Sequence, residues 1–133
     1  MHMSRWQLVA GFAAVMVAGL LAPCATAKER LIALFDYRIQ RQTKLRYKGC
    51  HFNKITAETC EDEQVYIRVK AHKGRFRQYI RDLVTAAGHR GVLEDEVLAD
   101  TLFLLLEGGI AVGAMFRNSE DAEKARRIAE LLL

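Results

Sequence analysis

The sequence predicts an all-α fold, and three observations support this prediction. Apolar residues recur every three or four positions through most of the 133-residue chain, which is the spacing of one face of a helix. The chain contains one proline and nine glycines, too few for a protein built from many strands and turns. Acidic residues open the later apolar runs and glycine or polar residues close them, so we expect about five helices joined by short connections.

The first predicted helix spans residues 28–42. Leu31, Leu34, Phe35 and Ile39 form its apolar stripe. A basic connector that contains Gly49 follows over residues 43–54, and we expect a short helix over residues 54–60.

The longest periodic run follows three acidic residues at positions 61–63, which favour a helix N-terminus. Its apolar stripe consists of Val65, Val69, His72, Phe76, Tyr79 or Ile80, Leu83 and Ala87. Gly88 is the expected C-terminal glycine. The outward face is basic and consists of Arg68, Lys70, Lys73, Arg75, Arg77 and Arg81. We interpret these charges as a solvated face rather than as a phosphate-binding or membrane-binding surface.

Two further helices are expected over residues 93–116 and from Asn118 or Ser119 to the C-terminal end. The first is apolar on several sides, which indicates burial by its own core and by another subunit. Its Asp100 and Glu107 make it a poor membrane span. Gly109 and Gly113 lie four residues apart and would let another backbone approach closely. The last helix has a narrow apolar stripe, formed by Ala122, Ala125, Ile128, Ala129 and Leu132.

Residues 6–27 contain no charged side chain, so we divide the chain into an apolar segment, 1–27, and a helical domain, 28–133. Arg5, the apolar run and Ala25-Thr26-Ala27 resemble a signal peptide with its cleavage site. The same stretch could be a retained anchor that contacts the membrane through residues 6–22, although it is short for a span. A third interpretation is a mis-assigned start whose apolar peptide has no role.

The sequence shows no pattern that points to catalysis. It contains no nucleophile–base constellation, no phosphate-binding loop and no metal-ligand spacing, so we expect no enzymatic activity, no metal and no cofactor. Cys50, His51, Cys60 and His72 lack the paired spacing of a zinc site. Cys50 and Cys60 could pair in an oxidising compartment, or remain free and behave as small buried hydrophobes in the cytosol.

Several short motifs, taken in order, resemble the C-terminal half of TetR-type transcriptional regulators. They are residues 29–36 (ERLIALFD), residues 47–53 (YKGCHFN) with Ala57-Glu58, His72-Lys73 with Arg77, residues 98–109 (LADTLFLLLEGG), and Ala125 with residues 129–132 (AELL). The resemblance covers residues 29–133. His51 stands where one branch of that family usually has proline, and Lys54 and Thr56 replace smaller or apolar residues.

The resemblance implies a cytoplasmic domain that senses a small apolar effector and forms a dimer. Effector-facing candidates are aromatic or ionisable residues, or their neighbours, on apolar stripes: Phe52, Val69, His72, Phe76 and Tyr79. The last two helices of each subunit would form the dimer interface, and its candidates are Leu102, Leu106, Gly109, Gly113, Ala125, Ile128 and Leu132.

These regulators begin with a helix-turn-helix domain that reads DNA, and residues 1–27 cannot supply one because they hold no polar recognition helix. The first functional hypothesis is therefore a regulator fragment that forms a homodimer, or a heterodimer with a full-length regulator, and does not bind DNA by itself. The alternative is a small exported or membrane-tethered helical binding protein that uses the same bundle. Direct nucleic-acid binding through the basic face is a weaker hypothesis, because Phe76 and Tyr79 are expected to be buried.

Overall fold

The computed structural model describes residues 26–59, 61–88 and 90–133, and this part of the chain is all-helical. Its helices, in chain order, are α2 (Ala27–Lys44), α3 (His51–Glu58), α4 (Glu63–Ala87), α5 (Asp95–Phe116) and α6 (Glu120–Leu132). The prediction of an all-α fold with five helices is confirmed for these residues. The predictions about an apolar segment before residue 26 and about Cys60 lie outside the described residues.

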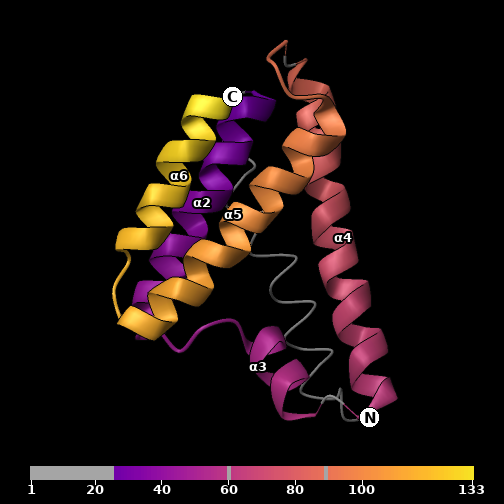
Figure 1. Cartoon of the computed structure of the whole chain (residues 1–133), viewed down its shortest axis with the longest axis vertical. Helices are drawn as coiled ribbons and strands as arrows, with labels where there is room; N and C mark the ends of the chain where they lie inside the picture. Colours follow the sequence, from indigo (N-terminus) through magenta and orange to yellow (C-terminus); the bar gives the residue numbers. More distant parts are fainter. Residues whose placement is uncertain (1–25, 60, 89) are drawn as a thin grey trace.

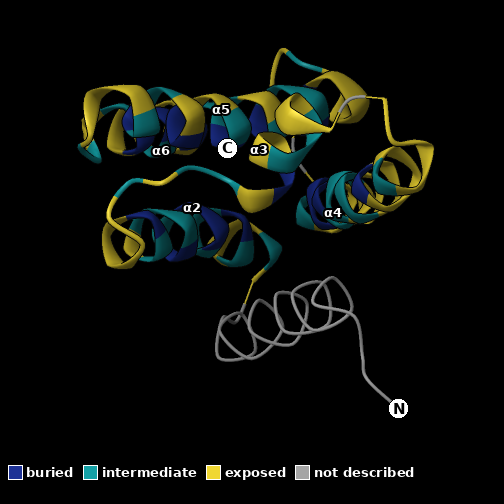
Figure 2. Cartoon of the chain, turned by 90° about the horizontal axis from the view of Figure 1, so that it is seen from below, coloured by how far each residue is buried: buried dark blue, intermediate teal, exposed yellow. Residues whose placement is uncertain are grey.

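The helices pack in two layers (Figures 1 and 2). α5 and α6 lie side by side in one layer, and α2 and α4 form the other. The short helix α3 packs against α4 at the end of the bundle where α4 begins. Between the layers lies the apolar core, whose buried members are Leu31, Leu34, Phe35, Ile80, Leu83, Val84, Leu98, Ala99, Leu102, Leu106, Ala125 and Ala129.

Local hydrogen bonds fix both ends of α2. At its start, the Thr26 hydroxyl accepts from the backbone N–H of Glu29, and the Glu29 carboxylate accepts from the N–H of Thr26, which is a capping box. At its end, the N–H of Tyr47 donates to the Gln42 carbonyl and that of Arg46 to the Thr43 carbonyl. This Schellman pattern needs a left-handed residue, and Arg46 adopts it with φ 54°. The helix therefore extends two residues beyond the predicted residue 42.

The short helix α3 begins at His51, three residues before the predicted start. Gly49, with φ 79°, turns the chain, and Cys50 is the N-cap in an extended conformation. The early start places Phe52 in the first turn, where it is buried. It also brings Cys50 and Asn53 close to α4 and α5, which matters for the site described below.

The basic face of α4 is only partly solvated, and here the prediction was wrong. Arg68, Lys70 and Arg75 are exposed. Lys73, by contrast, is half-buried and contacts Glu107, and Arg77 and Arg81 both turn toward Asp100 of α5. The ends of the helix agree with the sequence: Asp62 caps the N-terminus through Gln64 and Val65, and Gly88 ends it in the left-handed region.

A close contact between α5 and α6 depends on the glycines of α5. A Cβ atom added at Gly109 would lie 3.0 Å from Cα of Ala122 and 3.2 Å from Cβ of Ala125. A Cβ atom added at Gly113 would collide with the side chain of Gln42 and lie 2.8 Å from the Asn118 carbonyl oxygen. The close approach that the glycine spacing predicts thus occurs within this chain.

Asn118 helps to start α6, because its side-chain oxygen accepts a hydrogen bond from the N–H of Glu120.

We expect Gly109→Ala to destabilise the fold and Gly108→Ala to stabilise it. A Cβ at Gly108 meets nothing within 4 Å, so the variant gains only the better helix propensity of alanine, about 0.5–1 kcal/mol. At Gly109 the crowding atoms belong partly to the backbone of α6, which cannot rotate away, and overpacking costs roughly 1–3 kcal/mol. Urea unfolding of both variants measures the difference, and equal free energies of unfolding would contradict the tight α5–α6 contact.

Among the described residues, α5 alone has the length and mean hydropathy, 1.7, of a candidate membrane span. A core helix of a soluble bundle has the same properties, and α5 contributes more core residues than any other described helix. Its two internal carboxylates, Asp100 and Glu107, face basic residues of α4.

Candidate functional site

A polar cluster lies where α2, α3, α4 and α5 meet. We call it the Glu107 cluster, and its members are Arg38 of α2, Cys50 and Asn53 at the start of α3, Lys73 of α4 and Glu107 of α5. The side chains of Arg38, Lys73 and Glu107 are 18%, 16% and 15% exposed, so the charges sit largely outside bulk water. One carboxylate therefore connects three other helices.

The contacts of Glu107 are short and numerous. The Lys73 ammonium donates to both carboxylate oxygens, with Nζ 2.7 Å from Oε1 and 2.8 Å from Oε2. The Asn53 amide donates to Oε2 at 3.2 Å, and the Arg38 guanidinium lies 3.9 Å from Oε1. The Lys73 ammonium also lies 3.3 Å from the Cys50 sulfur and donates to it. Lys73 is thus shared between a carboxylate and a thiol.

The electrostatics of the cluster favour negative charge. Burial raises the pKa of the Glu107 carboxyl. The charges of Lys73 and Arg38 and the hydrogen bonds from Lys73 and Asn53 together lower it by more, so the pKa falls below its ordinary value. Burial likewise raises the pKa of the Cys50 thiol, and the charges of Lys73 and Arg38 outweigh it, so this pKa is also lowered. Two cations face one carboxylate here, and the cluster carries a surplus positive charge while the thiol is protonated.

Of the five effector-facing candidates, two contact each other directly. The rings of Phe52 and His72 stack with their centroids 4.0 Å apart and nearly parallel. Burial lowers the pKa of His72, and the charges of Lys73, Arg75 and Arg38 lower it further, so the imidazole is neutral at pH 7. Val69 is buried one turn earlier on α4. The stacked rings of Phe52 and His72 form a contact between α3 and α4.

The other two candidates, Phe76 and Tyr79, lie farther along α4 and pack against the main core. The Phe76 ring meets the ring of Phe103 on α5 at a centroid distance of 6.2 Å. The guanidinium of Arg77 covers the same Phe103 ring at 4.5 Å. The structure therefore brings Phe52 and His72 together and places Phe76 and Tyr79 against the main core.

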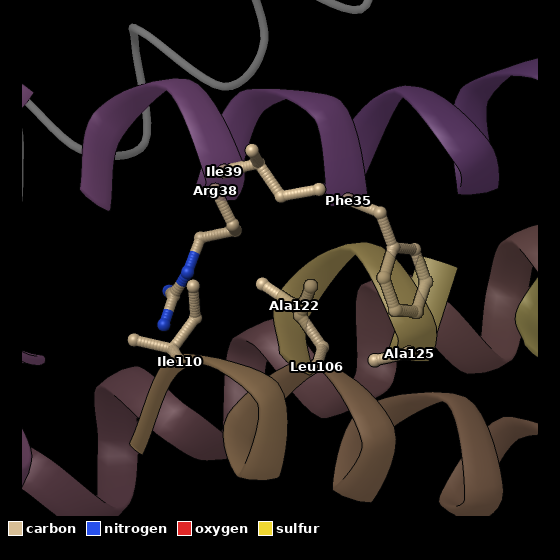
Figure 3. Close-up of a pocket in the computed structure, with 7 residues that line it drawn as sticks. All are labelled: Phe35, Arg38, Ile39, Leu106, Ile110, Ala122 and Ala125. Carbon is tan, nitrogen blue, oxygen red and sulfur yellow. The ribbon is translucent and has the colours of Figure 1, made fainter. Parts of the chain in front are cut away.

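Two hollows lie beside α2 in the described part of the chain, and neither is lined by an effector-facing candidate. One lies between α2, α5 and α6, where Phe35, Arg38 and Ile39 point toward Leu106, Ile110, Ala122 and Ala125 (Figure 3). It is too narrow to admit a water molecule. The other is an open recess beside α2 and the end of α6, lined by Thr26, Lys28, Glu29, Ile32, Ala33, Asp36 and Glu130.

The predicted dimer-interface residues divide into two groups. Leu102, Leu106, Gly109, Gly113 and Ala125 are buried inside this chain, so a second copy could not touch them without separating α5 from its own neighbours. For these five residues the structure corrects the assignment. Ile128 is 45% exposed and Leu132 is half-buried, so both remain accessible on α6.

The opposite side of α5 carries an uncharged exposed surface, which we call the α5 stripe. Its residues are spaced alternately by four and three positions, which places them on one helix face: Val97, Thr101, Leu104, Gly108, Ala111 and Met115. Val97, Leu104 and Met115 are 49%, 62% and 70% exposed. The helix that packs against α5, α6, carries two further exposed apolar residues, Ile128 and Leu131. Exposed apolar patches of this kind mark interaction sites.

Sequence reasoning missed the Glu107 cluster and the α5 stripe. A carboxylate in the middle of an otherwise apolar helix was the available signal for the cluster, since a buried charge needs a partner. For the stripe, the signal was apolarity on all sides of one helix. The sequence does not show which side of α5 faces the core and which faces outward, because that depends on the packing of α2, α4 and α6.

Comparison with known proteins adds no relative: no protein-family model, curated protein or solved structure matches this chain.

Proposed function

We propose that this chain is the effector-sensing and dimerisation unit of a TetR-type transcriptional regulator, and that its residues do not read DNA themselves. The proposal combines the order of short motifs along residues 29–133 with the all-helical bundle of α2 to α6. The observation that carries it is the α5 stripe, which presents six uncharged residues to solvent on a helix that otherwise forms the core.

Pairing of two copies would bury the α5 stripe together with Ile128 and Leu131 of α6. Leu104 lies near the middle of the stripe, and a leucine exposed to 62% gains about 25 cal/mol for each square ångström removed from water. The stripe contains no charged residue, so a symmetric partner would not have to desolvate a charge at its centre. The second copy is thus the partner that this surface fits best.

The effector in this proposal is a small apolar molecule that binds where α3 meets α4, beside Phe52, Val69 and His72. A neutral imidazole stacked on a phenyl ring presents a flat surface with polar edges to such a ligand. The Glu107 cluster is joined to this contact through the backbone, because Lys73 follows His72 and Asn53 follows Phe52. A ligand that separated the two rings would therefore act on the ion pairs that connect α3, α4 and α5.

The test is co-purification of two differently tagged copies of the full chain. We expect wild-type protein captured by one tag to retain a copy that carries the other tag. Leu104→Glu in one copy should reduce this recovery by about tenfold or more, which is equivalent to ~1.4 kcal/mol. Ala86→Glu, on the exposed side of α4, is the matched control and should not change recovery. Equal recovery of Leu104→Glu and Ala86→Glu would exclude the α5 stripe as the contact.

The same assay addresses the heterodimer. A tagged full-length regulator of the TetR type, co-expressed with this chain, would retain it through the same stripe, and operator binding should weaken because half-sites are read in pairs. Recovery of homodimers alone would remove this part of the proposal.

A second candidate function is motivated by the uncharged run of residues 6–27: a small exported or membrane-tethered helical binding protein. Cell fractionation of a C-terminally tagged chain, followed by N-terminal sequencing, distinguishes the two. Cleavage after Ala27 or recovery in the membrane fraction favours this candidate, and uncleaved chain in the soluble cytoplasmic fraction favours the regulator unit.

A further inference from the structure

One end of the bundle combines exposed cations with exposed apolar side chains. It lies where α2 and α5 both end (Figures 1 and 2). There a Cβ atom added at Gly49 would lie 3.5 Å from Cβ of Ala114, and Gln42 donates to a carbonyl of α5. We call this surface the Phe116 end. Its members are the exposed residues Lys44, Leu45, Arg46, Lys48, Phe116 and Arg117.

Positive charge is in excess at the Phe116 end. Its four cations are Lys44, Arg46, Lys48 and Arg117. None of them forms an ion pair with another described residue. The sequence contains no acidic residue from position 37 to position 57. Glu120 and Asp121 open α6 at the same end, but Asp121 is paired with Lys124, so these two acids do not balance the four cations.

The backbone at the two arginines is an independent observation. α4 ends at Gly88 in the left-handed region, where glycine is the usual residue. Arg46 and Arg117 adopt the same conformation after α2 and α5, with φ 54° and 55°. A residue with a Cβ atom is strained there, and glycine would be the more stable choice. The chain thus carries this strain at two positions where it gains an exposed cation.

The apolar members of the Phe116 end indicate the kind of partner. Leu45 and Phe116 are 45% and 67% exposed. A lipid bilayer accepts both kinds of group, because acyl chains bury apolar side chains while anionic headgroups attract cations. A second copy of this surface would bring like charges together, and a nucleic acid would leave Leu45 without an apolar partner.

From this arrangement we infer that the Phe116 end docks the bundle on an anionic lipid bilayer. Leu45 and Phe116 enter the boundary between headgroups and acyl chains, and the four cations remain at the headgroups. The contact uses only residues of the helical bundle. It also leaves the centre of the α5 stripe free, because Leu104 lies about 18 Å from Phe116 along the helix. The inference therefore does not rest on the proposed function.

The experiment is co-sedimentation of the full-length chain with vesicles of phosphatidylcholine, either alone or with about one-third phosphatidylserine. We expect binding to the anionic vesicles to be tighter by about tenfold or more, and to weaken as salt is added. Lys44→Gln/Arg46→Gln/Lys48→Gln should weaken it about 100-fold, since each basic residue at such a surface contributes about fivefold.

The matched control is Arg68→Gln/Lys70→Gln/Arg75→Gln, which removes the same number of exposed charges from α4. Its binding should remain within about threefold of wild type, because charges away from the contact are screened. Arg46→Gly/Arg117→Gly keeps the result interpretable if the first variant folds poorly, since glycine suits both left-handed positions. Its thermal midpoint should be no lower than that of wild type, and its binding about 25-fold weaker.

Fluorescence reports insertion at the Phe116 end itself. Trp6 is the only tryptophan of the chain, so Trp6→Phe/Phe116→Trp moves this reporter to the proposed contact. Anionic vesicles should shift its emission to shorter wavelength, and phosphatidylcholine alone should not. Equal binding to both kinds of vesicle, or an equal loss in the α4 control, would overturn the inference. So would an unshifted emission, which together with charge-dependent binding would reassign the surface to anionic polymers such as nucleic acid.

Discussion

Leu102→Ala is expected to lower the free energy of unfolding by about 3 kcal/mol, because large-to-small changes at fully buried leucines cost roughly 2–5 kcal/mol. Leu102 is 1% exposed and lies in the core, with α2, α4 and α6 closing around α5. The cost has two parts, the lost burial of the side chain and the cavity that remains. Neighbouring helices cannot collapse into that cavity without breaking their other contacts.

Ile67→Ala is the matched control for this prediction. Ile67 lies on α4 and is 50% exposed, so truncation of its side chain should change stability by less than about 0.5–1 kcal/mol. Urea unfolding followed by circular dichroism measures both variants at the same protein concentration. Similar losses for the two variants would show that Leu102 does not occupy the core described for α5.

Lys73→Met is the second change for which we expect a large effect, a loss of about 2–3 kcal/mol at pH 7, since removal of one partner leaves a largely buried carboxylate without its cation. Glu107 is 15% exposed and receives its two shortest hydrogen bonds from Lys73. Arg38 at 3.9 Å and Asn53 remain, which keeps the loss below that of a fully isolated charge. Arg75→Met, on the exposed side of the same helix, is the control.

The pH dependence of this loss follows from the pKa of Glu107. In the wild type the folded-state pKa is lowered, so Glu107 contributes stability above its unfolded pKa of about 4.5, and this contribution disappears as the pH falls through the folded-state value. In Lys73→Met the buried carboxyl takes up a proton more readily. The difference between the two proteins should therefore shrink between pH 7 and pH 4, and a constant difference would contradict the role of Glu107.

The helices themselves could be predicted from the sequence because their signals are local. The apolar stripe of α4, its acidic start and Gly88 specify that helix without reference to the rest of the chain. α3 was placed three residues too late, because its N-cap, Cys50, makes no side-chain capping bond that a sequence pattern would reveal. Its start depends on the turn at Gly49.

The candidate site could be predicted only in part, because it depends on which helices meet. Phe52 and His72 were both among the candidates from the sequence, and their rings stack in the structure. Their contact with an effector stays a prediction. The sequence placed Lys73 on a solvated face, although one flank of that face meets α5. Similarly, four of the five buried interface candidates belong to the inner side of α5, and only tertiary packing distinguishes that side from the α5 stripe. The fifth, Ala125, is buried on α6.

The central claim of this account is that the α5 stripe joins two copies of the chain. The most direct test is the mass of the full-length wild-type protein, measured by sedimentation equilibrium over a range of micromolar concentrations. We expect a mass approaching twice 15.1 kDa that falls toward that of one chain on dilution. A mass of one chain throughout, at concentrations up to about 100 μM, would contradict the claim, since a specific interface of standard size binds more tightly than that.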